Sequence, residues 1–179
     1  MKRNYIIAAF RETVAQQFPE QSVELNRLLD EKLSRLRSMH LNASKEKQFH
    51  LESQILPGIA AYETLQTVMP KDEALQTVHG YVAEHAWTMR KTILKLLKVP
   101  GLYHLPPVPF SKLTPKFYGE TAGFAATEYQ TSGGVWRIDM TKCPYHDTCV
   151  EHGCPELCPC FCDSDDIAYD AVSYTHLRA

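Results

Sequence analysis

The chain lacks both a long apolar run and a strong net charge. No stretch of its 179 residues approaches the roughly 18 apolar residues of a membrane span. Its 19 Lys and Arg residues nearly balance its 21 Asp and Glu residues, so the formal net charge is -2. Nucleic-acid binding normally shows a basic excess clustered on one face. We therefore expect neither a membrane nor a nucleic acid as partner.

The N-terminal segment also lacks the features of a secretion signal. Lys2 and Arg3 precede an apolar stretch of six residues, which Arg11 and Glu12 end, and no cleavage site follows. A signal peptide needs a longer apolar region and a small-residue cleavage site. We interpret the segment as the first helix and expect a cytoplasmic protein.

Cysteine is absent from the first 142 residues, and all six cysteines fall within the next twenty. Disulfide frameworks spread their cysteines along the chain, so this crowding indicates free thiols or a metal site. The successive gaps of six, five, four, two and two residues contain no Cys-x-x-Cys pair, which argues against a structural zinc site. An iron–sulfur cluster tolerates irregular spacing and stays an alternative. The six are Cys143, Cys149, Cys154, Cys158, Cys160 and Cys162.

Periodic apolar positions predict helices over residues 1–99. Ser22 can cap a helix whose apolar residues recur at spacings of three and four as far as Met39. Pro57 should end the segment before it and serve as the first residue of another helix. Residues 72–98 form the longest periodic run. These patterns together predict a bundle of about four helices.

Prolines and strand-like alternation organise the rest of the chain. Five prolines between residues 100 and 115 predict an irregular connection over residues 100–116. Residues 135–140 alternate as a half-buried strand does, and residues 117–130 are either its partner strand or another helix. We expect an α+β protein, with the helical bundle packed on a small antiparallel sheet. The strand and a Cys-rich helical segment, with the site at the sheet's edge, would occupy residues 117–171.

The first candidate for chemistry is Cys143. Pro144 suits the first position of a helix, which leaves Cys143 at its N-cap, directly after the predicted strand. The positive end of the helix dipole favours thiolate over thiol, so Cys143 is a candidate nucleophile. His146 lies one turn on and is a candidate proton partner. The alternative is that Cys143 is a small buried hydrophobe and His146 a surface residue.

The second candidate pair is Cys162 with Asp165. Pro155 and Pro159 argue against one continuous helix after Gly153. A new helix beginning near Pro159 places Cys162 and Asp165 on one face. A carboxylate one turn from a thiol can position a water molecule or accept a proton. The neighbouring aspartates are interpreted as solvated helix surface.

Four segments carry a resemblance to a known family. Leu56–Tyr62, Cys143–Tyr145, Gly153–Leu157 and Phe161–Asp166 together resemble the L-2-amino-thiazoline-4-carboxylic acid hydrolase family, over about residues 50–170. The resemblance implies hydrolytic opening of a five-membered thiazoline ring to N-carbamoyl-L-cysteine, a step in bacterial cysteine formation. The late motifs carry most of its specificity.

The resemblance also implies roles for single residues. The family's recurrent cysteine falls on Cys143, and its Cys-x-x-Asp falls on Cys162 and Asp165. Arg137 is a candidate to bind the carboxylate of a small-molecule substrate through two parallel hydrogen bonds, the alternative being an exposed strand arginine. Glu156 is a second candidate for substrate binding. No cofactor is expected, and the alternative function is a module that binds zinc, an iron–sulfur cluster or a small molecule through the cysteines.

The end of the chain departs from the family pattern. Family members generally continue through a further strand pair, which this chain stops before. Residues 172–179 resemble translated adapter sequence, and we interpret them as a non-native tail. We expect the natural protein to be longer, with its C-terminal strands missing here.

Overall fold

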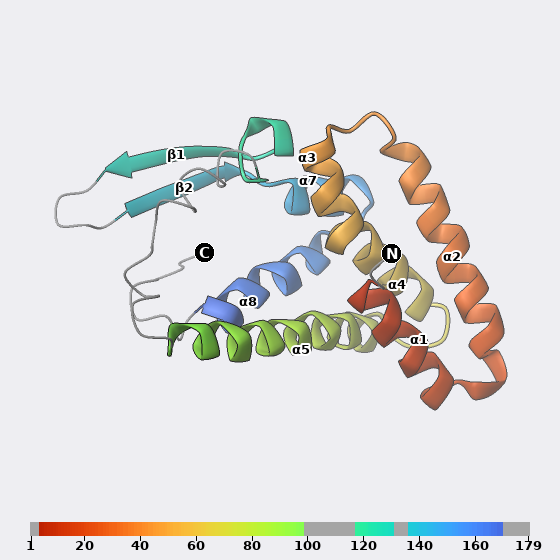
Figure 1. Ribbon diagram of the computed structural model, residues 1–179. Coiled ribbons are helices and arrows are strands. Elements are labelled where there is room, and N and C mark those ends of the chain that lie inside the picture. The colour runs from red at the N-terminus through yellow and green to blue at the C-terminus, as the bar shows by residue number, and fades with distance from the viewer. Residues whose placement is uncertain (1–3, 99–116, 131–135, 170–179) are drawn as a thin grey trace.

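The computed structural model describes residues 4–98, 117–130 and 136–169, with side chains described for all of these except 97, 128–130 and 136–138. The fold is helical with one antiparallel hairpin (Figure 1), which confirms the α+β class. The predicted connection 100–116 and the tail 172–179 lie outside the described residues. The helices are α1 (Tyr5–Gln17), α2 (Ser22–Met39), α3 (Lys45–His50), α4 (Leu56–Leu65), α5 (Lys71–Leu97), α7 (Pro144–Glu151) and α8 (Cys158–Tyr169). Short helical turns are η1 (Pro19–Gln21), η2 (Leu51–Ile55), η4 (Glu120–Ala122) and η5 (Pro155–Leu157), and the strands are β1 (Ala125–Gln130) and β2 (Trp136–Lys142).

The first two helices follow their apolar patterns. α1 begins at Tyr5, which confirms that the N-terminal segment is a helix, and α2 buries one stripe of leucines. Ser22 is the first residue of α2 rather than its cap, because its hydroxyl donates to the Pro19 carbonyl. Met39 at the other end is 58% exposed. The buried residues are Ile6, Phe10 and Val14 of α1 and Leu25, Leu29, Leu33 and Leu36 of α2.

Pro57 does not end the helix before it, so that prediction is wrong. The chain runs from α3 through the π-helical turn η2 into α4, where Pro57 is the second residue. A proline within a helix leaves a carbonyl four residues earlier without a donor, and here that carbonyl belongs to Ser53. The Asn4 side-chain amide donates to it over 2.9 Å. The wider π turn and the donor from Asn4 together accommodate the proline.

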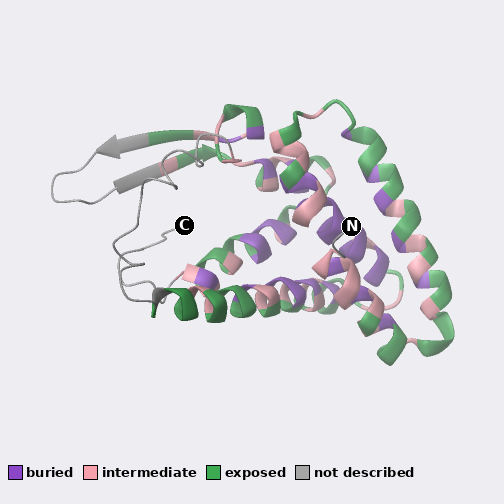
Figure 2. Ribbon diagram, viewed as in Figure 1, coloured by how far each residue is buried: buried purple, intermediate pink, exposed green. Residues whose placement is uncertain are grey.

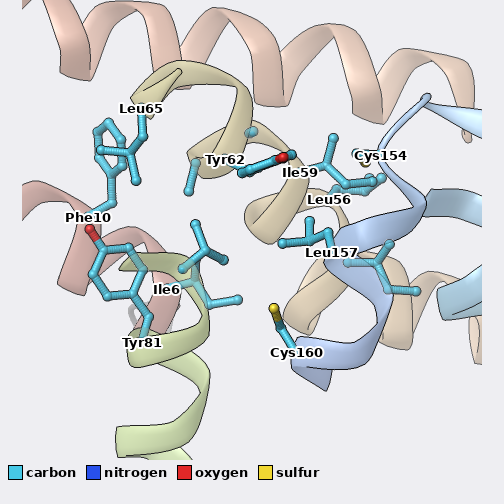
Figure 3. Close-up of a cluster of buried hydrophobic side chains, with 14 of the residues drawn as sticks. Ile6, Phe10, Leu56, Ile59, Tyr62, Leu65, Tyr81, Cys154, Leu157 and Cys160 are labelled. Carbon is cyan, nitrogen blue, oxygen red and sulfur yellow. The ribbon is translucent and has the colours of Figure 1, made fainter. Parts of the chain in front are cut away.

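α4 is the centre of the core. Nearly all of its residues are buried (Figure 2), and η5 and the first turn of α8 pack against it. Figure 3 shows Cys154 and Leu157 beside Leu56 and Ile59 of α4. The C-terminal segment therefore completes the core of the N-terminal helices.

Gly58 permits a close approach between α4 and α8. A Cβ atom added at Gly58 would lie 2.7 Å from Cζ of Phe161, which is less than any side chain tolerates. The ring of Phe161 is 4% exposed and packs against the α4 backbone. This contact fixes the first turns of α8, and hence the position of Cys162, the next residue along.

α5 confirms the longest predicted helix and supports α8 along much of its length (Figure 1). His79 of α5 contacts Asp163 of α8, with 3.1 Å between Nε2 and Oδ2. Further along, the Arg90 guanidinium donates to the Ile167 carbonyl over 3.0 Å. None of the described helices is both long enough and apolar enough to cross a membrane.

The hairpin confirms one predicted strand and resolves its partner. β2 pairs antiparallel with β1, with Ala125 opposite Lys142 and Gln130 opposite Trp136. The hairpin extends beside the helices in Figure 1. No described hairpin side chain belongs to the main core. Packing of the bundle on the sheet therefore gains no support from the described side chains, and α4 supplies the apolar surface on which the other helices close.

Candidate functional site

β2 delivers Cys143 to the start of α7, as the sequence predicts. Cys143 is the N-cap, with an extended backbone (φ -138°, ψ 123°), and Pro144 is the first helical residue. The backbone amides of Tyr145 and His146 point at the Cys143 sulfur and favour its thiolate. Burial acts the other way and is the larger effect, so the pKa of Cys143 is raised from its ordinary value. The predicted activation of this thiol by the helix N-terminus is therefore outweighed.

Cys162, in the second turn of α8, has the opposite environment. The Cys158 thiol, one turn earlier, donates a hydrogen bond that lowers the pKa of Cys162 to about 7. Burial and the nearby charges of Asp165 and Asp163 oppose this shift and do not cancel it. The side chain is exposed at the surface. The lowered pKa of Cys162 favours its thiolate, and the exposed side chain is accessible to a small molecule.

The two thiols are close enough for their charges to act on one another. The charge of Cys162 contributes to raising the pKa of Cys143, and the charge of Cys143 acts in the same way on Cys158. α7 and α8 are joined only by the short turn η5. The thiol at the start of α7 and the thiol pair of α8 thus form one sulfur cluster around Cys143, Cys158 and Cys162.

Asp165 lies one turn after Cys162 on α8. Partial withdrawal of its carboxyl from solvent raises the pKa to about 6, and the charge of Asp166 adds to the shift. The residue as a whole is exposed, and its charge adds to the raised pKa values of three nearby tyrosines. These are Tyr118, Tyr145 and Tyr169. A carboxylate with a pKa this close to neutral is suited to exchange protons with a substrate or water.

His50 is a site residue that sequence reasoning missed. It is buried at the end of α3, and its Nε2 lies 2.6 Å from the Phe117 carbonyl, so Nε2 carries the proton. Its Nδ1 lies 3.2 Å from the Tyr145 hydroxyl, which therefore donates to it. Burial lowers the pKa of His50 and keeps the ring neutral. The only sequence signal was its place shortly before the Leu56–Tyr62 motif.

A shallow open depression adjoins the sulfur cluster at Cys143. It has a volume of about 200 Å³, and it is formed where β2 ends and α7 begins. His146 borders it as an exposed side chain, with its Nδ1 3.5 Å from Oδ1 of Asp147. The lining residues are Met140, Thr141, Lys142, Cys143, His146 and Asp147. Lys142 is the one cation among these lining residues.

The structure separates the two predicted substrate-binding residues from the cluster. Arg137 lies in β2 opposite Tyr129. Its side chain is outside the described residues. Six residues of strand separate it from Cys143, which corresponds to about 20 Å. Glu156 in η5 accepts hydrogen bonds from Tyr62 (2.7 Å) and Lys71 (2.8 Å), so it holds η5 against α4 and α5. Substrate binding by either residue stays a prediction.

The other cysteines are packing residues in this structure. Cys149, Cys154 and Cys160 are buried, and all are free thiols. The Cys149 thiol donates to Cys154, which raises the pKa of Cys149. Within the described part of the chain, the group that brings three metal-binding atoms together contains no cysteine. Zinc or iron–sulfur binding by the cysteines gains no support here and stays a prediction.

Comparison with sequence models of known families gives a match for this chain. The sequence model of the L-2-amino-thiazoline-4-carboxylic acid hydrolase family matches residues 48–178, which is more than half of the chain. The chain belongs to this family. The matched hydrolase segment begins just before His50 and includes the whole sulfur cluster and Asp165. No curated protein and no solved structure matches the chain significantly.

Proposed function

We propose that this family member opens a small ring like that of L-2-amino-thiazoline-4-carboxylate to give an N-carbamoyl amino acid. Two findings support the proposal. The chain belongs to a family named for this hydrolysis. On α8, Cys162, with a pKa of about 7, lies one turn from Asp165, with a pKa of about 6. The pairing of a nucleophile with a base at these values is the observation that carries the proposal.

In this hydrolysis, the ring carbon between sulfur and nitrogen loses its bond to the ring sulfur and gains a bond to oxygen from water. In the first step the Cys162 thiolate attacks the ring carbon between sulfur and nitrogen, and the bond from that carbon to the ring sulfur breaks. The ring sulfur leaves as a thiolate that takes up a proton. Cys143, whose raised pKa keeps it protonated, donates a hydrogen bond to this leaving sulfur. The substrate carbon is then bonded to the Cys162 sulfur and to two nitrogens.

The second step releases the product. Asp165 accepts a proton from a water molecule, whose oxygen attacks the same carbon, and the bond to the Cys162 sulfur breaks. A carbonyl forms at that carbon as the second proton of the water passes to the former ring nitrogen, and Cys162 leaves as thiolate. Asp165 returns its proton to solvent, which replaces the solvent proton that the ring sulfur took up, so one water has been consumed.

We place the carboxylate end of the substrate in the depression beside Cys143, so that the ring extends from there toward Cys162, which does not itself line the depression. Lys142 there pairs with the substrate carboxylate, while His146 contacts the ring. Arg137 is the alternative carboxylate ligand. Lys142→Ala and Arg137→Ala form a matched pair. If Lys142 binds the carboxylate, Lys142→Ala should raise KM with kcat little changed, and Arg137→Ala should not. If Arg137 is the ligand instead, only Arg137→Ala should raise KM.

The decisive test compares two aspartates of one helix. Asp165→Asn should lower kcat/KM for aminothiazoline carboxylate by on the order of 10²–10⁴-fold. Asp163→Asn, which removes the acid that contacts His79, should not. Free-thiol release measures the activity. Mass spectrometry of Asp165→Asn with substrate should show an adduct on Cys162, because the second step is blocked. Equal activity of both variants and the wild type would refute the assignment.

A further inference from the structure

A second cluster of potential ligands lies at the far end of α7 from Cys143. His40 directly follows α2, and Glu151 and His152 end α7. The two Nε2 atoms are 2.9 Å apart. One ligand atom from each of the three residues lies within 4.8 Å of the others. His40 is buried, His152 half-buried and Glu151 exposed, so the group is anchored in the fold and open on one side.

We propose that His40, His152 and Glu151 bind a divalent metal ion of the zinc class. Two imidazole nitrogens and a carboxylate are a usual zinc ligand set, with the fourth position taken by water. Nitrogens bound to one tetrahedral zinc lie about 3.3 Å apart, so the observed separation needs only a small opening. A simple hydrogen bond between the two rings would not require the third ligand from Glu151.

The backbone around the three side chains adds a second, independent attraction for a cation. His40 and His152 are the C-cap residues of α2 and α7, so two helix C-termini converge on the cluster. Each helix C-terminus carries a partial negative charge, which favours a cation within the last turn. The Lys47 ammonium opposes this attraction at His40, and the Glu151 carboxylate offsets it.

The metal would tie the C-terminus of α2 to the C-terminus of α7. The two histidines are 112 residues apart in sequence. Cys143 lies before α7, and Cys158 and Cys162 lie in α8, so an ion at the C-terminus of α7 would stabilise the segment that carries the sulfur cluster. His40 also precedes the matched segment 48–178, so the family match does not account for it. The inference is independent of the proposed hydrolase function.

Cobalt(II) is the probe that separates this site from the cysteines. Cobalt bound to thiolates gives intense charge-transfer absorption in the near ultraviolet, whereas a histidine and carboxylate site lacks it. Wild-type protein that has been treated with chelator should bind one equivalent of Co²⁺ in equilibrium dialysis. The absorption spectrum of the Co²⁺ complex should lack the thiolate bands. His40→Gln and His152→Gln should weaken this binding at least about tenfold, because each removes a ligand. His79→Gln, on the surface of α5, is the matched control and should bind as the wild type does.

Glu151→Gln keeps the test conclusive if a histidine variant fails to fold. Glu151 is exposed, so this variant should melt as the metal-free wild type does while binding Co²⁺ more weakly. Zinc should raise the melting temperature of the wild type and raise it less in Glu151→Gln. Absence of Co²⁺ binding in the wild type, or binding that His152→Gln and Glu151→Gln leave unchanged, would overturn the proposal.

Discussion

The N-terminus of α7 and the second turn of α8 each present a thiol to the same cluster, yet the two thiols differ in acidity. Cys143 has the helix amides that usually favour a thiolate, and its pKa is raised because burial is the larger effect. Cys162 lies inside a helix, and its pKa falls to about 7 because the neighbouring Cys158 thiol donates to it. Burial and a single thiol donor therefore affect the acidity of these thiols more than a helix N-terminus does.

The largest expected effect is on catalysis. Cys162→Ser should lower kcat/KM by about a hundredfold or more, because a serine hydroxyl is not ionised at neutral pH. Cys143→Ser should lose much less, because serine is a good N-cap residue and can still donate a hydrogen bond. Free-thiol release from aminothiazoline carboxylate measures both. A larger loss of kcat/KM in Cys143→Ser than in Cys162→Ser would indicate that Cys143, at the start of α7, is the nucleophile.

A smaller effect concerns how α8 is held. Gly58→Ala should destabilise the protein by about 1–3 kcal/mol, because the added methyl group displaces the buried Phe161 ring. Gly80→Ala is the matched control on α5. No atom lies within 4 Å of its added Cβ. A helix-interior alanine should stabilise by up to about 1 kcal/mol. Urea unfolding measures both, and equal stability of the two variants would contradict the packing role of Gly58.

The smallest expected effect is on the pH dependence of stability. The folded-state pKa of Asp165 is about 6, against an ordinary value of 3.8, so the folded state binds more protons between these values. Stability contributed by this group is present below pH 3.8 and is lost as pH rises to about 6. Asp165→Asn should therefore be more stable than the wild type at pH 7, by no more than about 1 kcal/mol after allowance for solvent screening. Denaturant unfolding at pH 4 and pH 7 measures the stability difference between Asp165→Asn and the wild type. If the variant lost stability relative to the wild type between pH 4 and pH 7, the pKa of Asp165 would not be raised in the folded state.

The local patterns of the sequence were sufficient for most elements. The periodicity of α2 and α5, the alternation of β2 and the prolines around α7 and α8 each depend on neighbours within a few residues. Pro57 was misread because the donor that accommodates it comes from Asn4, about fifty residues earlier. The packing of the bundle on the sheet stays a prediction, because strand alternation does not show which surface a strand will meet.

The sequence predicted where the two candidate thiols lie in their helices and did not predict their acidity. Residue spacing placed Cys143 at an N-cap and Cys162 one turn from Asp165, as the structure has them. Their pKa shifts depend on burial and on neighbours such as Cys158, which a sequence does not display. His50 escaped notice because its partners, Tyr145 and Phe117, are far along the chain.

The pH dependence of alkylation of the two thiols tests the central comparison most directly. Iodoacetamide labelling, followed by peptide mass spectrometry, should modify Cys162 with a midpoint near pH 7 and Cys143 with a midpoint clearly above that. Cys158→Ala should move the Cys162 midpoint upward by removing the donor, and Cys158→Ser should largely keep it because the hydroxyl still donates. Labelling of Cys143 at a lower pH than Cys162 would contradict the account.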